Sequence, residues 1–232
     1  MSEPTINPGT ELPESRLYTF VDAGVENAVF FLEGQQLILD LARIHPVVGS
    51  GFAYFRDVVL SLQPLLAFLK RGEQIGLYID SEEPMFRLKI ESSFIGHTRC
   101  SLMPEGFQEF PEAVVGVARV VKLFPDQRPS YSSAVRLDGL SLGESVNQVL
   151  RASYQVASVV LVAGASDQSA MIHRLPSTDQ GASDNPMAAA ERLRDLLAAP
   201  LNEIFGRGLT DEEEIRRAFA AVPHSSHVTP SR

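Results

Sequence analysis

The residues that could do chemistry are few and scattered along the chain. His97 and Cys100 could suggest a metal or thiol site, with Arg99 lowering the pKa of the thiol. In an extended strand, positions 97 and 100 point to opposite faces, so they would not bind one metal ion together. His224 and His227 lie in a tail containing Pro and Ser. We therefore expect structural or exposed side chains at these positions, with a redox-reactive Cys100 and a weak histidine metal site as the alternatives.

A second group of candidates surrounds the start of a predicted helix. Gly49-Ser50-Gly51 could present backbone N–H groups to an anion, but it lacks the lysine of a phosphate-binding loop. Ser50, His45 and Asp57 could form a nucleophile set, yet no nucleophile-elbow pattern surrounds Ser50. We predict a plain loop and helix start here. The sequence thus predicts no catalytic residue, no metal, no cofactor and no enzymatic activity.

Composition narrows the possible partners. The net charge of the 232 residues is −9, and the longest basic clusters are Lys70-Arg71 and Arg216-Arg217, so nucleic-acid binding is disfavoured. With Cys100 as the single cysteine, the chain can form neither an internal disulfide nor a zinc site built on cysteines. No apolar run approaches the roughly 18 residues that span a bilayer, and the first residues do not resemble a signal peptide. We expect a cytoplasmic protein that does not bind membranes.

The hydrophobic pattern predicts an α+β fold. Apolar residues recur at helical spacing from Phe52 to Leu69, which predicts a long buried helix. Pro64 lies inside it and should kink it near Leu60–Gln63. Ser141-Leu142-Gly143-Glu144 is a capping-box pattern that opens another helix. Period-2 alternation and short apolar runs predict strands at Leu17–Asp22, Val25–Leu32, Gln74–Asp80, Met85–Glu91, Ile95–Met103, Val114–Phe124, Tyr131–Leu137, Ser158–Ala163 and Gln168–Leu175.

These elements predict one large core with appendages. We expect a mixed or antiparallel sheet packed against the long apolar helix, followed by a helical C-terminal extension. The extension contains two helical patterns, Ala188–Phe205 and Asp211–Val222. The predicted organisation is a flexible tail at 1–15, a core domain at 16–176, a linker at 177–187, the helical extension at 188–222 and a flexible tail at 223–232.

The order of these segments resembles the chaperone domain of the heat-shock protein 33 family. Leu17–Val21 resembles the opening strand of that family, and Phe55–Ile79 its long apolar helix followed by the entry into the sheet. Asp80–Ile90 (DSEEPMFRLKI) resembles its turn and paired strand, and Tyr131–Leu150 its strand, loop and capped helix. Ser153-Tyr154-Gln155 stands where the family usually has Ser-Glu-Gln. The likeness covers about 160 residues and implies a chaperone that holds unfolding proteins without ATP.

The chain departs from the family pattern in its cysteines. The resemblance implies a zinc domain with a Cys-x-Cys pair and a later Cys-x-x-Cys pair, whose oxidation releases zinc and exposes a client-binding surface. This chain has no cysteine after Cys100, so the redox switch cannot be carried over. The resemblance also implies a homodimer, with exchange of the C-terminal region as one arrangement.

The apolar stripe of the C-terminal extension is the candidate functional surface. Such stripes usually pack on the domain's own sheet. In the alternative interpretation they form a lid that lifts to admit unfolded or partly folded client proteins. The candidate client-binding residues are Leu197, Leu201, Ile204, Phe205, Ile215 and Phe219. A second hypothesis keeps the same fold as a non-catalytic adaptor or regulatory module that binds one specific protein partner through 188–222.

Overall fold

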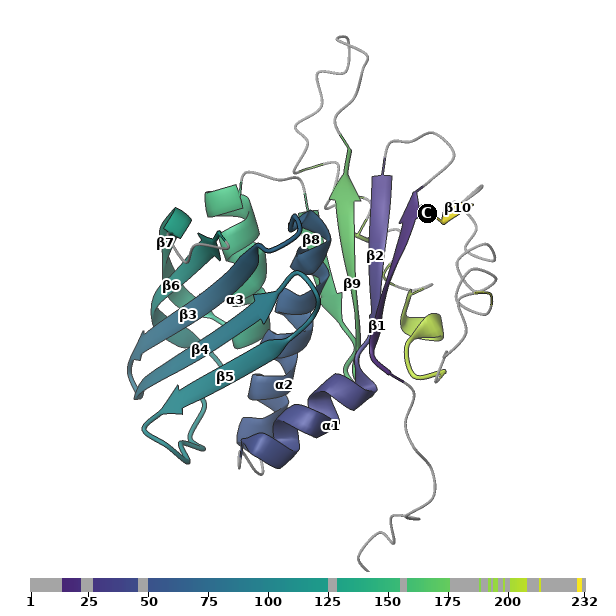
Figure 1. The fold of residues 1–232 in the computed structure, drawn as a ribbon. Helices are drawn as coiled ribbons and strands as arrows, with labels where there is room; N and C mark the ends of the chain where they lie inside the picture. Colours follow the sequence, from purple (N-terminus) through teal and green to yellow (C-terminus); the bar gives the residue numbers. More distant parts are fainter. Residues whose placement is uncertain are drawn as a thin grey trace, which may run out of the picture.

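Two antiparallel sheets of five strands each enclose a layer of helices (Figure 1). This computed structural model describes residues 14–21, 27–45, 50–124, 129–154, 158–175, 188, 192, 194–195, 198, 201–207, 213 and 229–230. Sheet A has the order β10-β1-β2-β9-β8, and sheet B the order β5-β4-β3-β6-β7. All the strand pairs in both sheets run antiparallel.

The strands of sheet A come from distant parts of the sequence, whereas those of sheet B form one continuous run. The strands of sheet A are β1 (Arg16–Val21), β2 (Asn27–Glu33), β8 (Ser158–Val162), β9 (Gln168–Arg174) and β10 (Thr229–Pro230). The strands of sheet B are β3 (Gln74–Glu82), β4 (Met85–Ser93), β5 (Thr98–Met103), β6 (Val114–Leu123) and β7 (Pro129–Leu140). Sheet A therefore closes only after residues 168–174 have returned to lie beside residues 27–33.

The helices occupy the space between the sheets. They are α1 (Gln35–Ile44), α2 (Ser50–Leu62), the 3-10 helix η1 (Gln63–Phe68), α3 (Leu142–Val149) and the π-helical turn η2 (Leu150–Tyr154). Figure 1 shows α2 and α3 behind sheet B and in front of β8. The predicted cap of α3 is confirmed, because the Ser141 side chain accepts a hydrogen bond from the Glu144 N–H at 3.2 Å.

Two expectations from the sequence are corrected. The predicted single sheet is two sheets, since a helix layer that is apolar all round needs a cover on both sides. The continuous helix from Phe52 to Leu69 is not confirmed either: α2 ends at Leu62 and the chain continues as η1. Pro64, at the start of η1, lacks the N–H that an α-helix would use there, which explains the change within the region of the predicted kink.

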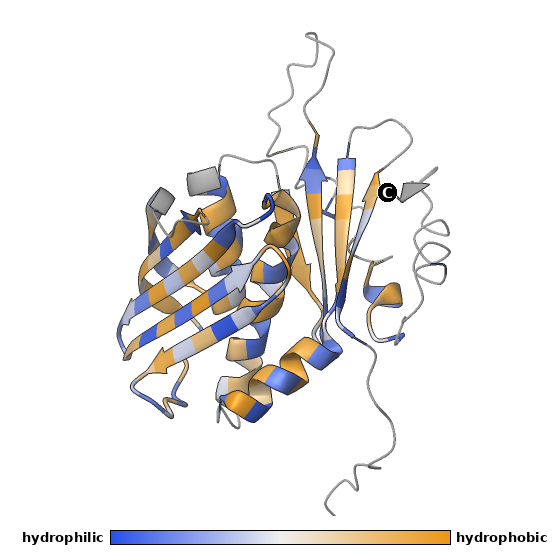
Figure 2. Cartoon of the chain, viewed as in Figure 1, coloured by the Kyte–Doolittle hydropathy of each residue, from blue (hydrophilic) through white to orange (hydrophobic). Residues whose placement is uncertain are grey.

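The apolar interior has two parts. The larger part joins the inner faces of both sheets to α2, η1 and α3, with Phe55, Leu60 and Leu62 among its fully buried side chains. The smaller part lies on the opposite side of sheet A. Figure 2 shows hydrophobic and hydrophilic residues alternating along β3 and β4, whereas β2 is hydrophobic over most of its length. Sheet B thus has one apolar face, and sheet A has two.

The outer edge of β8 is closed by a side chain. The side-chain amide of Asn147, on α3, donates to the Val160 C=O at 3.0 Å and accepts from the Val160 N–H at 2.8 Å. Asn147 is 4% exposed, so the pair is shielded from water. One buried side chain therefore satisfies both edge groups of Val160, which a neighbouring strand would otherwise do.

Candidate functional site

Three of the six candidate client-binding residues lie in the described part of the chain, and they pack against the protein itself. Leu201 and Ile204 are 0% and 2% exposed, and Phe205 is half-buried. Residues 201–204 are helical. Leu197, Ile215 and Phe219 lie outside the described residues.

These three residues cover one face of sheet A, which we call the covered face. It is formed by alternate residues of β1 and β2 together with residues of β9: Tyr18, Phe20, Val29, Phe31, Ala170 and Ile172. The rings of Phe31 and Phe205 stack with centroids 6.1 Å apart. β2 is consequently buried on both sides, because its other face packs into the larger core. The covered face is a broad apolar surface beneath a short helical segment.

The covering segment ends at a glycine that is tied to sheet A. The Phe205 N–H donates to the Leu201 C=O at 2.8 Å, and Gly206 has a φ of +84°, which favours glycine because it carries no Cβ. The Gly206 N–H donates to Oε1 of Gln168 at 2.7 Å. Gln168 is the first residue of β9, so the end of the covering helix is held by the sheet that it covers.

Gln168 connects this end to a buried carboxyl group. Its Oε1 also accepts from the Ser166 hydroxyl at 2.7 Å, and its Nε2 donates to Oε2 of Glu33 at 2.6 Å. Burial raises the pKa of Glu33, and the charge of Asp167 acts in the same direction, while the hydrogen bond from Gln168 opposes both. The state of a buried acid is therefore coupled to the contact that holds Gly206.

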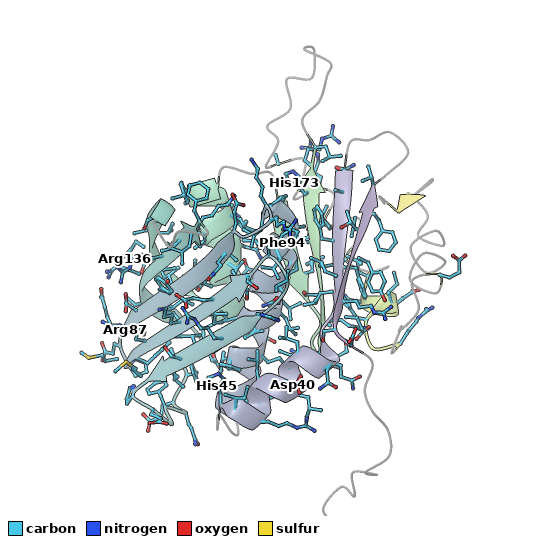
Figure 3. The ribbon with its side chains drawn as sticks, viewed as in Figure 1. Asp40, His45, Arg87, Phe94, Arg136 and His173 are labelled. Carbon is cyan, nitrogen blue, oxygen red and sulfur yellow. The ribbon has the colours of Figure 1, made fainter. Side chains whose placement is uncertain are left out.

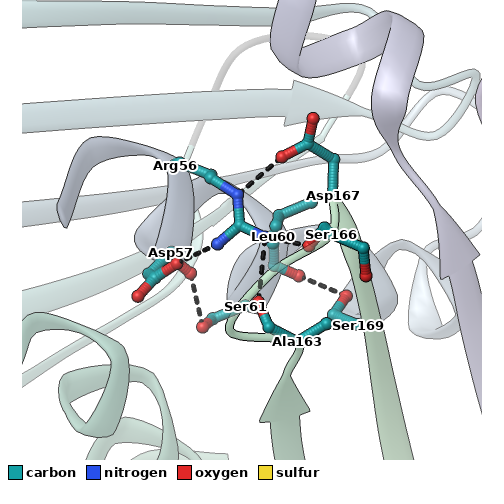
Figure 4. Close-up of polar contacts among 8 residues, drawn as sticks. All are labelled: Arg56, Asp57, Leu60, Ser61, Ala163, Ser166, Asp167 and Ser169. Atoms are coloured by element: carbon teal, nitrogen blue, oxygen red, sulfur yellow. Dashed lines mark hydrogen bonds and ion pairs between the residues drawn. The ribbon is translucent and has the colours of Figure 1, made fainter. Parts of the chain in front are cut away.

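A buried arginine holds the turn from which Gln168 projects (Figure 4). Arg56, on α2, donates through Nε to Oδ1 of Asp167 at 2.6 Å and through a terminal nitrogen to the C=O groups of Ala163 and Ser166. Its other terminal nitrogen donates to Asp57 at 2.5 Å. The charge is paired and hydrogen-bonded on all sides, so its role is to position the turn rather than to bind an anion.

The other sequence candidates do not assemble into a catalytic site. The ring of His45 packs against Phe55, and Asp57 is engaged by Arg56, so the described contacts do not join them to Ser50. Burial raises the pKa of the Cys100 thiol to about 12, which leaves it protonated and unreactive at neutral pH. His97 is exposed in the turn between β4 and β5.

Metal and membrane sites were sought among the described residues as well. No group of three or more His, Cys, Asp or Glu side chains in that part of the chain is placed to hold a metal ion. Within the same residues, no helix has the length and apolar character needed to cross a bilayer. His224 and His227 fall outside the described residues.

The polar contacts behind the covered face were not predicted from the sequence. Gln168 and Glu33 are separated by 135 residues, and Arg56 and Asp167 by 111. No motif or spacing marks them, because they meet only when β9 pairs with β2. The one signal available was Arg56 itself, a charged residue within the strongest apolar helical pattern of the chain.

Comparison with known proteins agrees with the fold and the order of the segments. A sequence profile described as Hsp33 protein matches residues 15–231. Among solved structures, the fold is similar to that of the 33 kDa chaperonin (heat shock protein 33 homolog) from Thermotoga maritima. That match has a TM-score of 0.66 and 14% identity, and covers 93% of this chain and 78% of the other. A comparison with curated protein sequences finds no match. Since the family profile spans nearly the whole chain, this protein belongs to the Hsp33 family.

Proposed function

We propose that the protein is an ATP-independent holdase that binds unfolding proteins on apolar surface and works without a zinc and cysteine redox switch. Membership in the Hsp33 family supports a chaperone role. The carrying observation is the covered face of sheet A, an apolar surface that is shielded by residues 201–205. Holding requires apolar area that binds without reading sequence, together with a cover that prevents self-association when no client is present.

The proposed mechanism is movement of the cover followed by capture. Leu201, Ile204 and Phe205 leave the covered face, so both the sheet and the apolar stripe of the extension become available to a client. Leu197, Ile215 and Phe219 would belong to the same stripe. No bond is formed or broken in this mechanism, and no catalytic group takes part. Unfolded or partly folded proteins are the proposed partners, in the cytoplasm, with neither nucleic acid nor membrane involved.

The proposal assigns no switching role to the thiol. Cys100 is the single cysteine of the chain, and its thiol is held protonated by burial. A redox switch of the family type needs thiolates that bind zinc when reduced and form disulfides when oxidised. Local opening of the C-terminal extension on heating is the trigger we propose instead.

Light scattering tests the proposal directly. Two unrelated proteins that aggregate on heating are incubated with and without this chain, in reductant and after peroxide treatment. We expect suppression of both at near-stoichiometric ratios and to the same extent under both redox conditions. A Cys100→Ser variant, measured in parallel, should behave like the wild type.

Two results would contradict this function. Suppression that appears only after oxidation and is lost in Cys100→Ser would restore a thiol-based switch. No suppression at several-fold excess would favour the adaptor hypothesis. In that case the next step is to identify a specific partner of residues 188–222.

A further inference from the structure

β5 forms one edge of sheet B (Figure 1). Among the described strands, β4 is the only one hydrogen-bonded to it. The turn between them is defined by two hydrogen bonds, from the Ser93 N–H to the His97 C=O at 2.9 Å and from the Gly96 N–H to the Ser93 C=O at 2.8 Å. Ser93 and His97 are thus a hydrogen-bonded pair, and this sets the alternation along the whole hairpin.

The alternation identifies which backbone groups of β5 face away from β4. Counting from the turn, Arg99 and Ser101 lie opposite Glu91 and Lys89 in hydrogen-bonded pairs. The N–H and C=O groups of the alternate residues, Thr98, Cys100 and Leu102, therefore point toward the outer edge. In the part of the chain that the structure describes, no backbone hydrogen bond reaches these groups from another strand or loop. Such a row is a template for an added strand.

Exposed apolar side chains lie at both ends of this edge. Phe94 and Ile95, in the turn labelled by Phe94 in Figure 3, are 42% and 69% exposed. Met103 and Met85, at the other end, are 61% and 79% exposed. They are four of the seven large apolar side chains that are exposed in the described part of the chain. Cavities of about 560 Å³ and 500 Å³ lie on the two sides of the turn, so an added segment could place side chains in both.

The charge beside the edge selects among possible occupants. The outer face of the β4–β5 hairpin carries Arg87, Lys89 and Arg99 against one acid, Glu91, whereas the whole chain has a net charge of −9. A second β5 would bring the same cations. If it paired antiparallel with Cys100 opposite Cys100, the two Arg99 side chains would be diagonal neighbours on one face. Repulsion between like charges therefore disfavours a second copy and favours a neutral or acidic segment.

From these observations we infer that the free edge of β5 binds an extended, apolar, neutral or acidic polypeptide segment by strand addition. Backbone hydrogen bonds to Thr98, Cys100 and Leu102 hold the segment, while the apolar side chains at the two ends of the edge contact its side chains. Because backbone bonds read little sequence, this edge would accept many different unfolded chains. The inference rests on the proposed holding function and names a binding surface separate from the covered face.

Amide hydrogen exchange, measured residue by residue with NMR, tests strand addition. The probe is a ten-residue peptide of alternating Val and Thr with Glu at each end. We expect the amides of Thr98, Cys100 and Leu102 to exchange at least about tenfold more slowly with saturating peptide. Arg99 and Ser101, already bonded to β4, should not change. The same peptide with every backbone nitrogen methylated should give no protection.

Two exchange results would overturn the inference. Uniform or absent protection of β5 with the unmethylated peptide would exclude strand addition. Protection of the three edge amides in the free protein that increases with protein concentration would assign the edge to a second copy of the chain.

A matched pair of variants at Cys100 isolates the edge hydrogen bond. Cys100→Pro removes an N–H that β4 does not use, whereas Cys100→Ala shortens the side chain and keeps that N–H. We expect peptide affinity, measured by fluorescence anisotropy, to fall by about tenfold in Cys100→Pro and to stay unchanged in Cys100→Ala. Equal affinities in two variants with wild-type circular dichroism would contradict the inference. If Cys100→Pro does not fold, the exchange pattern of the wild type decides.

The two proposals can fail separately. Peptide binding with alternating protection, but without suppression of aggregation, would remove the holding function and leave strand addition standing. Suppression of aggregation without peptide binding would leave the holding function and remove the role of β5.

Discussion

Asn147 illustrates how one residue can determine the behaviour of a whole edge. β8 is the last strand of sheet A, and its Val160 would have no backbone partner on the helix side. The Asn147 amide supplies both a donor and an acceptor there. β5, the corresponding edge of sheet B, has no equivalent in the described residues. The contrast between a closed edge and an open edge is the residue-level basis of the inference about β5.

We predict that Asn147→Ala destabilises the protein by about 2–4 kcal/mol. The substitution leaves the N–H and C=O of Val160 buried without partners, and each unsatisfied group costs about 1–3 kcal/mol. Urea unfolding followed by circular dichroism measures the loss. Gln148→Ala, on the same helix and half-exposed, is the control and should change the free energy of unfolding little. Equal effects of the two substitutions would mean that the Asn147 hydrogen bonds contribute nothing specific.

Glu33 makes stability depend on pH at a single residue. Burial raises its pKa above the ordinary value of 4.5, so the folded state binds this proton more tightly than the unfolded chain does. Its contribution to stability is therefore fully present below pH 4.5 and is lost as the pH rises through the folded-state pKa. At neutral pH, charged Glu33 opposes folding.

We predict that Glu33→Gln is more stable than the wild type at neutral pH and similar to it near pH 4. The amide keeps an oxygen that can accept from Gln168 but carries no charge to bury. Thermal melting across this pH range gives the comparison. A stability difference that stays constant with pH, or one that favours the wild type at pH 7, would exclude Glu33 as the titrating group.

At the scale of elements, residues 201–207 act as a clamp on sheet A. Apolar contacts by Leu201, Ile204 and Phe205 and one hydrogen bond from Gly206 to Gln168 attach this short segment. Local opening costs less where few buried contacts hold an element. The clamp is thus a candidate for the first part of the fold to move on heating.

We predict that Leu201→Asp opens the clamp and increases holding below the melting temperature. A charge at a position that is 0% exposed cannot remain against the covered face. Asn202→Asp adds the same charge at an exposed neighbour and is the matched control. Binding of the dye bis-ANS should rise in the first variant only, together with suppression of aggregation. Reduced holding in a folded Leu201→Asp protein would show that Leu201 serves the client contact and not the cover.

At the scale of the whole molecule, the chain separates a rigid two-sheet core from the segment that covers it. The core is held by β2 and β9, which pair over their full lengths, and by the helix layer between the sheets. The cover lies outside this arrangement, on the far face of sheet A (Figure 1). Removing the cover should therefore expose apolar surface without dismantling the core.

We predict that deletion of residues 186–232 gives constitutive holding at temperatures where the full chain is inactive. The covered face would then be exposed permanently, so the deletion protein should also self-associate more at high concentration. Light scattering measures holding, and circular dichroism checks that the core remains folded. A folded but inactive deletion protein would refute heat-driven opening as the trigger.

Local structure could be predicted well from the sequence where one short segment contains the whole signal. The capping box at Ser141, the alternation of β3 and β4 and the effect of Pro64 each depend on neighbours within a few residues. The candidate stripe at Leu201 and Ile204 was visible for the same reason, since helical spacing places both on one face. Whether that stripe faces a client or the protein's own sheet is not a local property.

The sequence by itself determined the segments, their apolar faces and the exclusion of an internal disulfide, because these follow from residue type and spacing. The tertiary structure alone decided that there are two sheets, that β8 is closed and β5 open, and that Glu33 meets Gln168 135 residues away. Strand pairing joins backbone groups that every residue carries, so partner choice leaves little trace in any one segment. It is settled by packing the helix layer between both sheets, which depends on the whole chain at once.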